Sequence, residues 1–217
     1  MTPDEGKRPT LNSIGDDVGR LDGERLAVFG YGSLVSRESV ALTLGREAPA
    51  PIPARLEGWR RRWSIYRKNT AHEKVFERVD SEPFEHVVGL NLEPAPDATK
   101  AEWPNGALIE LTKAEIERLD LREVRYDRVE VTDGARAEGL GFDRVYAFVA
   151  KSEHFAAETP PDAIVIASYV EACKAAFEEL GPGAWEQFEA TTGEPPVPVV
   201  EARLVADAIP EGNPRAW

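Results

Sequence analysis

The chain holds 217 residues, of which 42% are hydrophobic and 30% charged. This length predicts one domain, since domains commonly hold roughly 100 to 200 residues, and no apolar run approaches the roughly 18 residues that a membrane-spanning helix needs. With 39 acidic against 26 basic side chains, the formal net charge of -13 repels phosphate backbones and anionic lipid headgroups. We therefore expect neither nucleic acid nor membrane among the partners.

The cysteine and histidine content indicates the compartment and the metal chemistry. A single cysteine cannot form an internal disulfide, and the start MTPDEGKRPT lacks the positive stretch and apolar core of a secretory signal, which predicts a cytoplasmic protein. His72, His86 and His154 are widely separated and provide none of the usual close ligand pairs. We expect no metal site and no cofactor, with a carboxylate-only Mg²⁺ site left open.

In chain order, residues 1–24 combine Asp, Gly, Pro and basic residues with few large apolar groups, which predicts a disordered tail. Folded structure is expected to begin at the apolar run 26–31, followed by a turn at Gly32 and Ser33 and a helix just after Ser33. The polar segments 69–85 and 93–103 are predicted to be loops. Strand-like apolar or alternating patterns occur in six further segments, 54–66, 87–92, 106–111, 126–131, 144–150 and 199–205.

Two predicted helices have recognisable start or stop signals, and a third helix is shorter. Residues 112–115 (TKAE) have the form of a capping box and predict a helix that ends at about Leu121. Residues 162–180 carry apolar side chains at steps of three or four and end at Gly181-Pro182, which predicts a long helix. A short helix is expected at 184–190.

Strands outnumber helices, and the helices do not alternate with them. This order predicts an α+β fold with a mixed sheet or small barrel rather than a doubly wound sheet. We expect one domain over residues 25–207 and a C-terminal tail over 208–217.

The sequence VFGYGSL, residues 28–34, has glycines at the end of an apolar strand, where they let a backbone approach a ligand closely. A Rossmann turn would need glycine in place of Val35, and a nucleophile elbow would need it in place of Tyr31 and Val35. Two interpretations stay open, a plain strand-to-helix turn and a cradle of backbone amides for an anion or oxyanion.

Two further residues are candidates for a site. Glu123 ends the sequence LDLRE just past the capped helix, where the chain turns into a strand and a side chain can be aimed into a cleft. With 39 acidic residues in the chain, a single glutamate has a low prior of being catalytic, so its surroundings must support the role. Tyr169 lies on the predicted long helix, where it either flanks the core or reaches a ligand with its hydroxyl.

A basic segment over residues 55–68 carries six basic side chains against Glu57, with two tryptophans between them. In a chain with a net charge of -13, this pattern favours a solvated strand face paired with neighbouring acids, with Trp59 or Trp63 packing inward. Binding of an anionic substrate is the alternative. The segment resembles a nucleic-acid-binding stripe only superficially.

Taken together, VFGYGSL, LDLRE followed by a tyrosine-led strand, and the spacing Tyr-x11-Gly from Tyr169 to Gly181 resemble the γ-glutamylcyclotransferase superfamily, which includes the AIG2-like proteins. The order and separation of these motifs match from about residue 26 to 191. The resemblance implies a small mixed β-barrel of about six to seven strands flanked by a few helices. It further implies that Glu123 is catalytic and that substrate is bound by Tyr169 and by the turn residues Phe29, Gly30, Tyr31, Gly32, Ser33 and Leu34.

The implied activity is cyclisation of the γ-glutamyl group of a small peptide or amine to 5-oxoproline, with release of the amine and no metal or cofactor. Residues 58–63 (GWRRRW) look like the glutathione-degrading ChaC branch, but the Pro-Gly-Arg-Val segment expected after Arg67 is absent. Tyr169 and residues 188–192 (FEATT) look like the general branch, which often has glycine in place of Val124. The leaving group and oligomeric state stay open, and the alternative is a non-catalytic binding or regulatory protein of the same fold.

Overall fold

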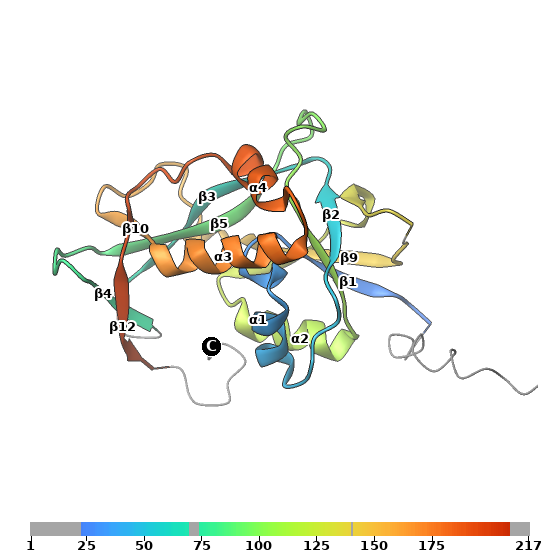
Figure 1. The fold of residues 1–217 in the computed structure, drawn as a ribbon, viewed down its shortest axis with the longest axis horizontal. Helices are drawn as coiled ribbons and strands as arrows, with labels where there is room; N and C mark the ends of the chain where they lie inside the picture. The colour runs from blue at the N-terminus through green and yellow to red at the C-terminus, as the bar shows by residue number, and fades with distance from the viewer. Residues whose placement is uncertain (1–22, 70–73, 140, 209–217) are drawn as a thin grey trace, which may run out of the picture.

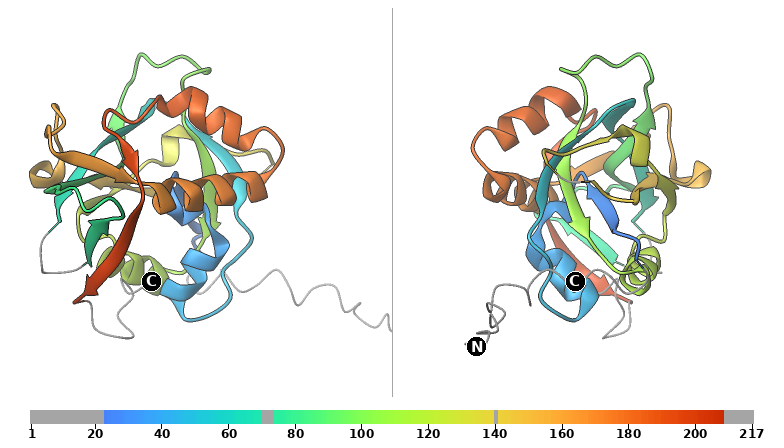
Figure 2. Two further views of the ribbon diagram at one scale, coloured as in Figure 1. Left: turned by 60° about the vertical axis from the view of Figure 1, so that its left-hand side comes forward. Right: turned by 90° about the vertical axis from the view of Figure 1, so that its right-hand side faces the viewer.

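The computed structural model describes residues 23–69, 74–139 and 141–208. The largest sheet in this part of the chain has six strands in the order β7-β9-β1-β6-β2-β8 and curls into half a barrel (Figures 1 and 2). β1 runs parallel to β9, and the other neighbours are antiparallel. The strands are β1 (Leu26–Gly30), β2 (Ile52–Leu56), β6 (Asn105–Glu110), β7 (Tyr126–Glu130), β8 (Ala135–Arg136) and β9 (Arg144–Ala150).

Two smaller sheets complete the β structure of the described residues. One has the order β11-β10-β5-β3, and the other pairs β12 with β4. β5 is tied to the six-stranded sheet by the side chain of Asn91, which accepts a hydrogen bond from the Ala150 amide at 2.8 Å, and by the Tyr126 hydroxyl, which donates to the Leu90 carbonyl at 2.9 Å. The strands are β3 (Trp59–Lys68), β4 (Lys74–Arg78), β5 (His86–Pro94), β10 (Ala163–Ile166), β11 (Val199–Val200) and β12 (Ala202–Asp207).

The helices cover the sheets on separate sides. In Figure 1, α3 crosses the front of the molecule with α4 above it, while α1 and α2 lie below. The capping box predicted at the start of α2 is confirmed, since the Glu115 amide donates to Thr112 Oγ1 at 3.3 Å and the Thr112 amide donates to Glu115 Oε2 at 2.9 Å. The helices are α1 (Arg37–Leu44), α2 (Lys113–Arg122), α3 (Ala167–Leu180) and α4 (Ala184–Thr192), with short 3₁₀ turns η2 (Ser33–Val35), η3 (Thr132–Gly134) and η4 (Ser152–His154).

β1 is buried on both faces, and this explains why its sequence is almost continuously apolar. Phe29 points into a cluster that also contains Leu92 of β5 and Phe177 of α3. Val28 points to the opposite face, into a second cluster with Ile116 of α2. Successive strand side chains alternate between faces, so one strand contributes to both cores. The turn that follows β1 therefore leaves the sheet between two packed layers.

The α+β class is confirmed, and several element boundaries are corrected. The predicted helix 162–180 begins as strand β10, because the β-branched Ile164, Val165 and Ile166 pair in parallel with β5 and β11 before α3 starts at Ala167. The predicted strand 54–66 is divided into β2 and β3 by a turn at Gly58, whose φ of 79° suits glycine.

Two further segments differ from prediction. The predicted loop 69–85 contains β4, and the predicted strand 199–205 is divided at Glu201 into β11 and β12. β4 is stabilised by antiparallel pairing with β12, a partner more than a hundred residues away in the sequence, so local composition gives little sign of it. The predicted tails 1–24 and 208–217 lie almost wholly outside the described residues, and the domain limits 25–207 stay a prediction. No helix in the described part of the chain has the length and apolarity needed to cross a membrane.

The basic segment departs from the prediction of a solvated face at Arg61. This side chain is fully buried, on the same inward-facing side of β3 as Trp63. Its guanidinium makes six hydrogen bonds and lies 3.9 Å from the centroid of the Phe188 ring. Arg60 follows the prediction, because it pairs with Glu102 at 2.8 Å. Inward packing of Trp63 is likewise confirmed.

Candidate active site

A cavity of about 440 Å³ lies where the turn after β1, the end of α2 and the start of α3 meet. Its inner wall is polar and comes from η2, the start of α1 and the end of α2. Its remaining walls come from β3, β5 and α3, with contributions from the β4–β12 pair. The inner wall consists of Ser33, Ser36, Ser39, Arg122 and Glu123.

Glu123 is the residue at which α2 ends. Its amide donates to the Leu119 carbonyl at 2.8 Å, and its carbonyl accepts from the Tyr126 amide at 2.9 Å, so the chain turns at once into β7. The capping box defines the start of α2, and Ile116 and Leu119 anchor the helix in the core. The position of the Glu123 side chain is thereby determined, and only 16% of it is exposed.

Arg122, next to Glu123, connects three elements of the inner wall. Its Nε lies 2.9 Å from Glu123 Oε1. Its two terminal nitrogens donate to the Ser39 carbonyl and Thr43 Oγ1 of α1, each at 2.9 Å, and to Ser39 Oγ at 2.8 Å. Nη2 also donates to Ser33 Oγ at 3.5 Å. Arg122 therefore aligns the carboxylate of Glu123 with the turn that contains Ser33.

Two opposing effects act on the Glu123 carboxyl group. Burial raises its pKa above the ordinary value, whereas the charge of Arg122, its hydrogen bond, and the charge of Arg125 lower it. Burial has the larger effect, so the pKa stays raised. A carboxylate that is desolvated yet held in place by a guanidinium is suited to accept a proton and return it.

Tyr169 projects from the first turn of α3 toward the turn after β1. A Cβ atom at Gly32 would lie 3.0 Å from the Tyr169 hydroxyl oxygen, so only glycine lets the backbone approach it without displacement. The Tyr169 ring meets Trp63 edge to face at 6.3 Å between centroids. Burial raises the pKa of the Tyr169 hydroxyl well above its usual range, so it stays protonated and able to donate. Ser33, Glu123 and Tyr169 all line the same cavity.

The other turn residues of the sequence prediction lie behind this wall. The side chains of Phe29, Tyr31 and Leu34 are buried in the cores, and the Tyr31 hydroxyl donates to the Phe148 carbonyl at 2.5 Å. Gly30 permits a tight turn, because a Cβ there would lie 2.9 Å from the Leu34 carbonyl carbon. Ser33 is the turn residue that borders the cavity in the described structure. Substrate binding by Phe29, Gly30, Tyr31, Gly32 and Leu34 stays a prediction that concerns their backbone.

The sequence analysis did not single out the outer part of the cavity. Phe76 of β4 and Leu204 of β12 form an apolar wall, and Arg67, Lys74 and Arg125 add positive charge. The cavity lining in the described residues thus holds more basic than acidic side chains, in a chain whose net charge is -13. Arg67 lies in the basic segment, where anion binding was the alternative interpretation. Phe76 carried no recognisable signal, because its strand pairs with a distant partner.

Solved structures share the fold of this chain, although no protein-family profile matches the chain and no curated protein sequence is significantly similar. A structure named as a γ-glutamyl cyclotransferase superposes with a TM-score of 0.53 at 15% identity, covering 79% of this chain and 89% of the other. The chain has the γ-glutamylcyclotransferase-like fold. An uncharacterized protein from Homo sapiens gives a TM-score of 0.55 at 16% identity, with the same two coverages.

These matches confirm, at the level of the fold, the resemblance seen in the three sequence motifs. In the γ-glutamylcyclotransferase-like fold of this chain, those motifs are brought to one place: the turn after β1, the end of α2 and the first turn of α3 all border one cavity. Arg122 is the inner-wall residue that the motif analysis quoted within LDLRE without assigning it a role. Its signal was its position directly before the candidate base.

Proposed function

We propose that the protein is a γ-glutamylcyclotransferase-type enzyme, which converts the γ-glutamyl group of a small peptide or amine to 5-oxoproline and releases the amine. The observation that carries this proposal is the Glu123 carboxylate, which is largely buried, borders the cavity and is held by Arg122 at 2.9 Å. A cavity that only binds an anionic substrate gains nothing from a desolvated carboxylate facing the ligand, whereas an enzyme that must move a proton does.

In the proposed reaction the substrate attacks itself. The α-ammonium group of the glutamyl unit loses a proton to Glu123, and the resulting amine attacks the γ-carbonyl carbon. A new C–N bond closes the five-membered ring, and the original amide C–N bond breaks as Glu123 returns its proton to the departing nitrogen. The attacking nitrogen gives up two protons in all, and the product amine leaves with both as an ammonium ion. The atoms balance without water, an oxidant or a protein nucleophile.

Intramolecular attack and proton transfer account for a large part of the expected rate. Folding the glutamyl chain so that its amine faces its own carbonyl exploits effective molarities of about 10⁵ M or more. A positioned base adds roughly 10² to 10⁴ in rate. Backbone amides of the turn at Gly32 and Ser33 are assigned to the substrate carboxylate or the developing oxyanion, where a preorganised donor contributes on the order of 3 kcal/mol.

The remaining groups are assigned by their chemistry. Tyr169 keeps its proton because it is buried, which suits donation of a hydrogen bond to the substrate. Arg122 acts as a positioning residue, since it aligns Glu123 through a side chain held by α1. Basic side chains in the outer part of the cavity complement a substrate that carries one or two carboxylates. The apolar surface of Phe76 and Leu204 does not select one leaving group among amino acids, peptides and amines.

The deciding experiment is to incubate the purified chain with glutathione, γ-glutamyl amino acids and γ-glutamyl amines and to measure 5-oxoproline. We expect release from at least one compound, and we expect turnover to persist in excess chelator because the proposed steps use only protein side chains. Saturable binding of γ-glutamyl compounds with no release from any of them would favour a binding protein. Loss of turnover in chelator, restored by a divalent ion, would contradict the cofactor-free mechanism.

A further inference from the structure

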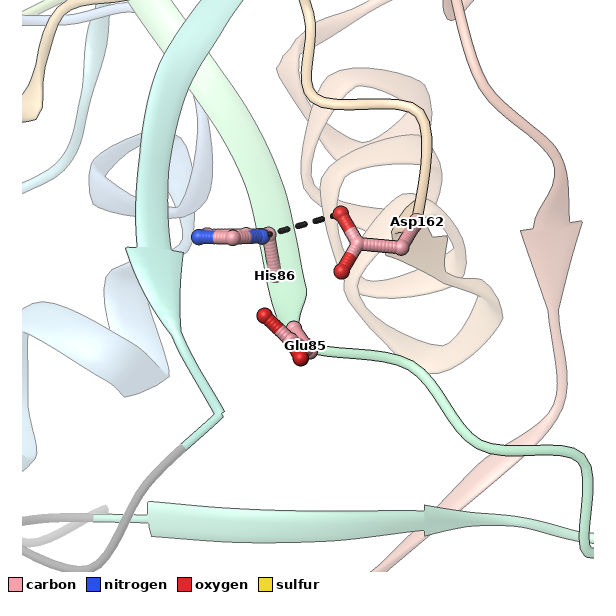
Figure 3. A group of neighbouring side chains, drawn as sticks. All are labelled: Glu85, His86 and Asp162. Carbon is pink, nitrogen blue, oxygen red and sulfur yellow. Dashed lines mark hydrogen bonds and ion pairs between the residues drawn. The ribbon is translucent and has the colours of Figure 1, made fainter.

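Three potential metal ligands meet at the start of β5, and none of them lines the cavity described above. Glu85, His86 and Asp162 each offer one ligand atom, and these atoms lie within 4.8 Å of one another. Figure 3 shows the three side chains facing each other between β5 and the segment that leads into β10. Asp162 is 76 residues from His86 in the sequence, so the histidine spacing could not indicate this group.

The backbone holds two of the three donors in place. β5 and β10 are parallel neighbours with His86 opposite Ala163, and the Glu85 amide donates to the Asp162 carbonyl at 3.3 Å. His86 Nδ1 and Asp162 Oδ1 are 3.2 Å apart. Ligands at about 2.0 to 2.1 Å from a tetrahedral ion are separated from each other by about 3.3 Å, so this pair already has the required spacing.

Glu85 supplies the adaptable third ligand. Its side chain is exposed, so its carboxylate is able to rotate toward the other two donors. The ligand atoms lie within 4.8 Å of one another, so bringing them to ligand spacing requires a movement of at most about 1.5 Å. His86 is better fixed, because its ring packs edge to face against Tyr66 at 5.6 Å between centroids.

We propose that Glu85, His86 and Asp162 form a binding site for a divalent transition-metal ion such as Zn²⁺. Two carboxylates and one neutral imidazole offset the charge of a 2+ ion, and this combination of oxygen and nitrogen ligands suits Zn²⁺, Mn²⁺ or Co²⁺ better than Cu⁺, which prefers sulfur. The bound ion links β5 to β10, which continues into α3 and Tyr169. Its role is therefore structural, and the site is independent of the proposed cyclisation.

The test is a calorimetric titration of the chelator-treated, dialysed full chain with ZnCl₂. We expect one saturable site per chain and, at a Zn²⁺ concentration a hundredfold above Kd, a rise in Tm of roughly 5 to 10 °C. His86→Gln and Glu85→Gln should each weaken binding at least tenfold, since a neutral amide oxygen binds Zn²⁺ less well than an imidazole nitrogen or a carboxylate. His154→Gln removes a histidine outside the group and should bind as wild type does.

Glu85→Gln keeps the test valid if His86→Gln impairs folding, because the exposed Glu85 side chain contributes little to the metal-free structure. Absence of saturable binding, or equal Kd values for Glu85→Gln and wild type, would overturn the metal site and leave His86 and Asp162 as a hydrogen-bonded pair between two strands. Because 5-oxoproline release is expected to persist in chelator, either result leaves the proposed function to its own assay.

Discussion

Two buried arginines hold the turn after β1 from different sides, and their surroundings differ. Arg61 donates to the Tyr31 carbonyl at 3.1 Å from the core side, whereas Arg122 approaches Ser33 Oγ from the side of the cavity. The other hydrogen bonds that Arg61 makes go to carbonyl, amide and hydroxyl oxygens of β6 and α4. Arg122 is next to a carboxylate, that of Glu123.

This difference separates a structural centre from the proposed chemical one. Burial lowers the pKa of Arg61 to about 9, and its six hydrogen bonds to neutral oxygens keep the charge satisfied at neutral pH. The positive charge of Arg122 instead opposes part of the rise that burial causes in the pKa of Glu123, whose side chain borders the cavity. Neutral partners rigidify the turn, and an acidic partner at a cavity wall creates a group able to exchange protons.

The largest effect is expected for Glu123→Gln, which removes the proposed base and keeps the side-chain size. Gln cannot accept a proton at neutral pH, so kcat should fall by roughly 10² to 10⁴ while the variant stays folded and still binds γ-glutamyl ligands. Steady-state kinetics and circular dichroism check this. Glu117→Gln, on the exposed face of the same helix, is the matched control. Retention of more than about a tenth of wild-type kcat would remove Glu123 from its proposed role.

The structural arginine should matter for stability. Arg61→Met removes the guanidinium donor from the buried carbonyls of Tyr31 and Asn105 and from Asn105 Oδ1, and each such loss costs about 1 to 3 kcal/mol. We expect the free energy of unfolding, measured in urea, to fall by about 3 kcal/mol or more. Arg62→Met, at the exposed neighbouring position, should change it by less than about 0.5 kcal/mol. Equal stability of the two variants would contradict the structural role of Arg61.

The chemical arginine should alter the pH profile. Arg122→Gln removes a positive charge that lowers the pKa of Glu123, so that pKa should rise further. In the proposed mechanism Glu123 acts in its ionised form, and kcat/KM should therefore begin to fall at a higher pH during acidification, with the acid limb displaced upward by about one pH unit or more. Arg122→Lys keeps the charge and should therefore leave the acid limb close to its wild-type position. An acid limb that is identical in wild type and Arg122→Gln would show that Arg122 does not act on Glu123.

Tyr169→Phe should have the smallest effect. It removes one hydroxyl and leaves the edge-to-face packing on Trp63 intact. If this hydroxyl donates to the substrate, kcat/KM should fall by the factor that corresponds to a loss of about 0.5 to 1.5 kcal/mol in transition-state binding. This is the usual net value of a neutral hydrogen bond. Thermal unfolding measured alongside separates this from destabilisation. Unchanged kinetics would assign Tyr169 to packing alone.

Local signals in the sequence were sufficient for much of the fold. The start of α2 was predictable because Thr112 and Glu115 satisfy each other's backbone amides within one turn. The end of α2 then followed, and with it the position of Glu123 at the junction with β7. Gly32 was expected to let the backbone approach a ligand, which stays a prediction, and the structure places the Tyr169 hydroxyl beside it. These inferences depend on neighbours in the chain or on glycine, whose consequences are local.

Only the tertiary structure decided which charged groups are buried and which distant strands pair. Arg61 has the same local pattern as Arg60 and Arg62, and its burial depends on Thr192, 131 residues away. β4 depends on β12, and β10 was hidden in a helical pattern until its pairing with β5 was known. Long-range contacts decide which charges pair, which residues line the cavity and which potential ligand groups meet, as for Glu85, His86 and Asp162. Capping and turn chemistry act over a few residues, so the sequence by itself determined those features.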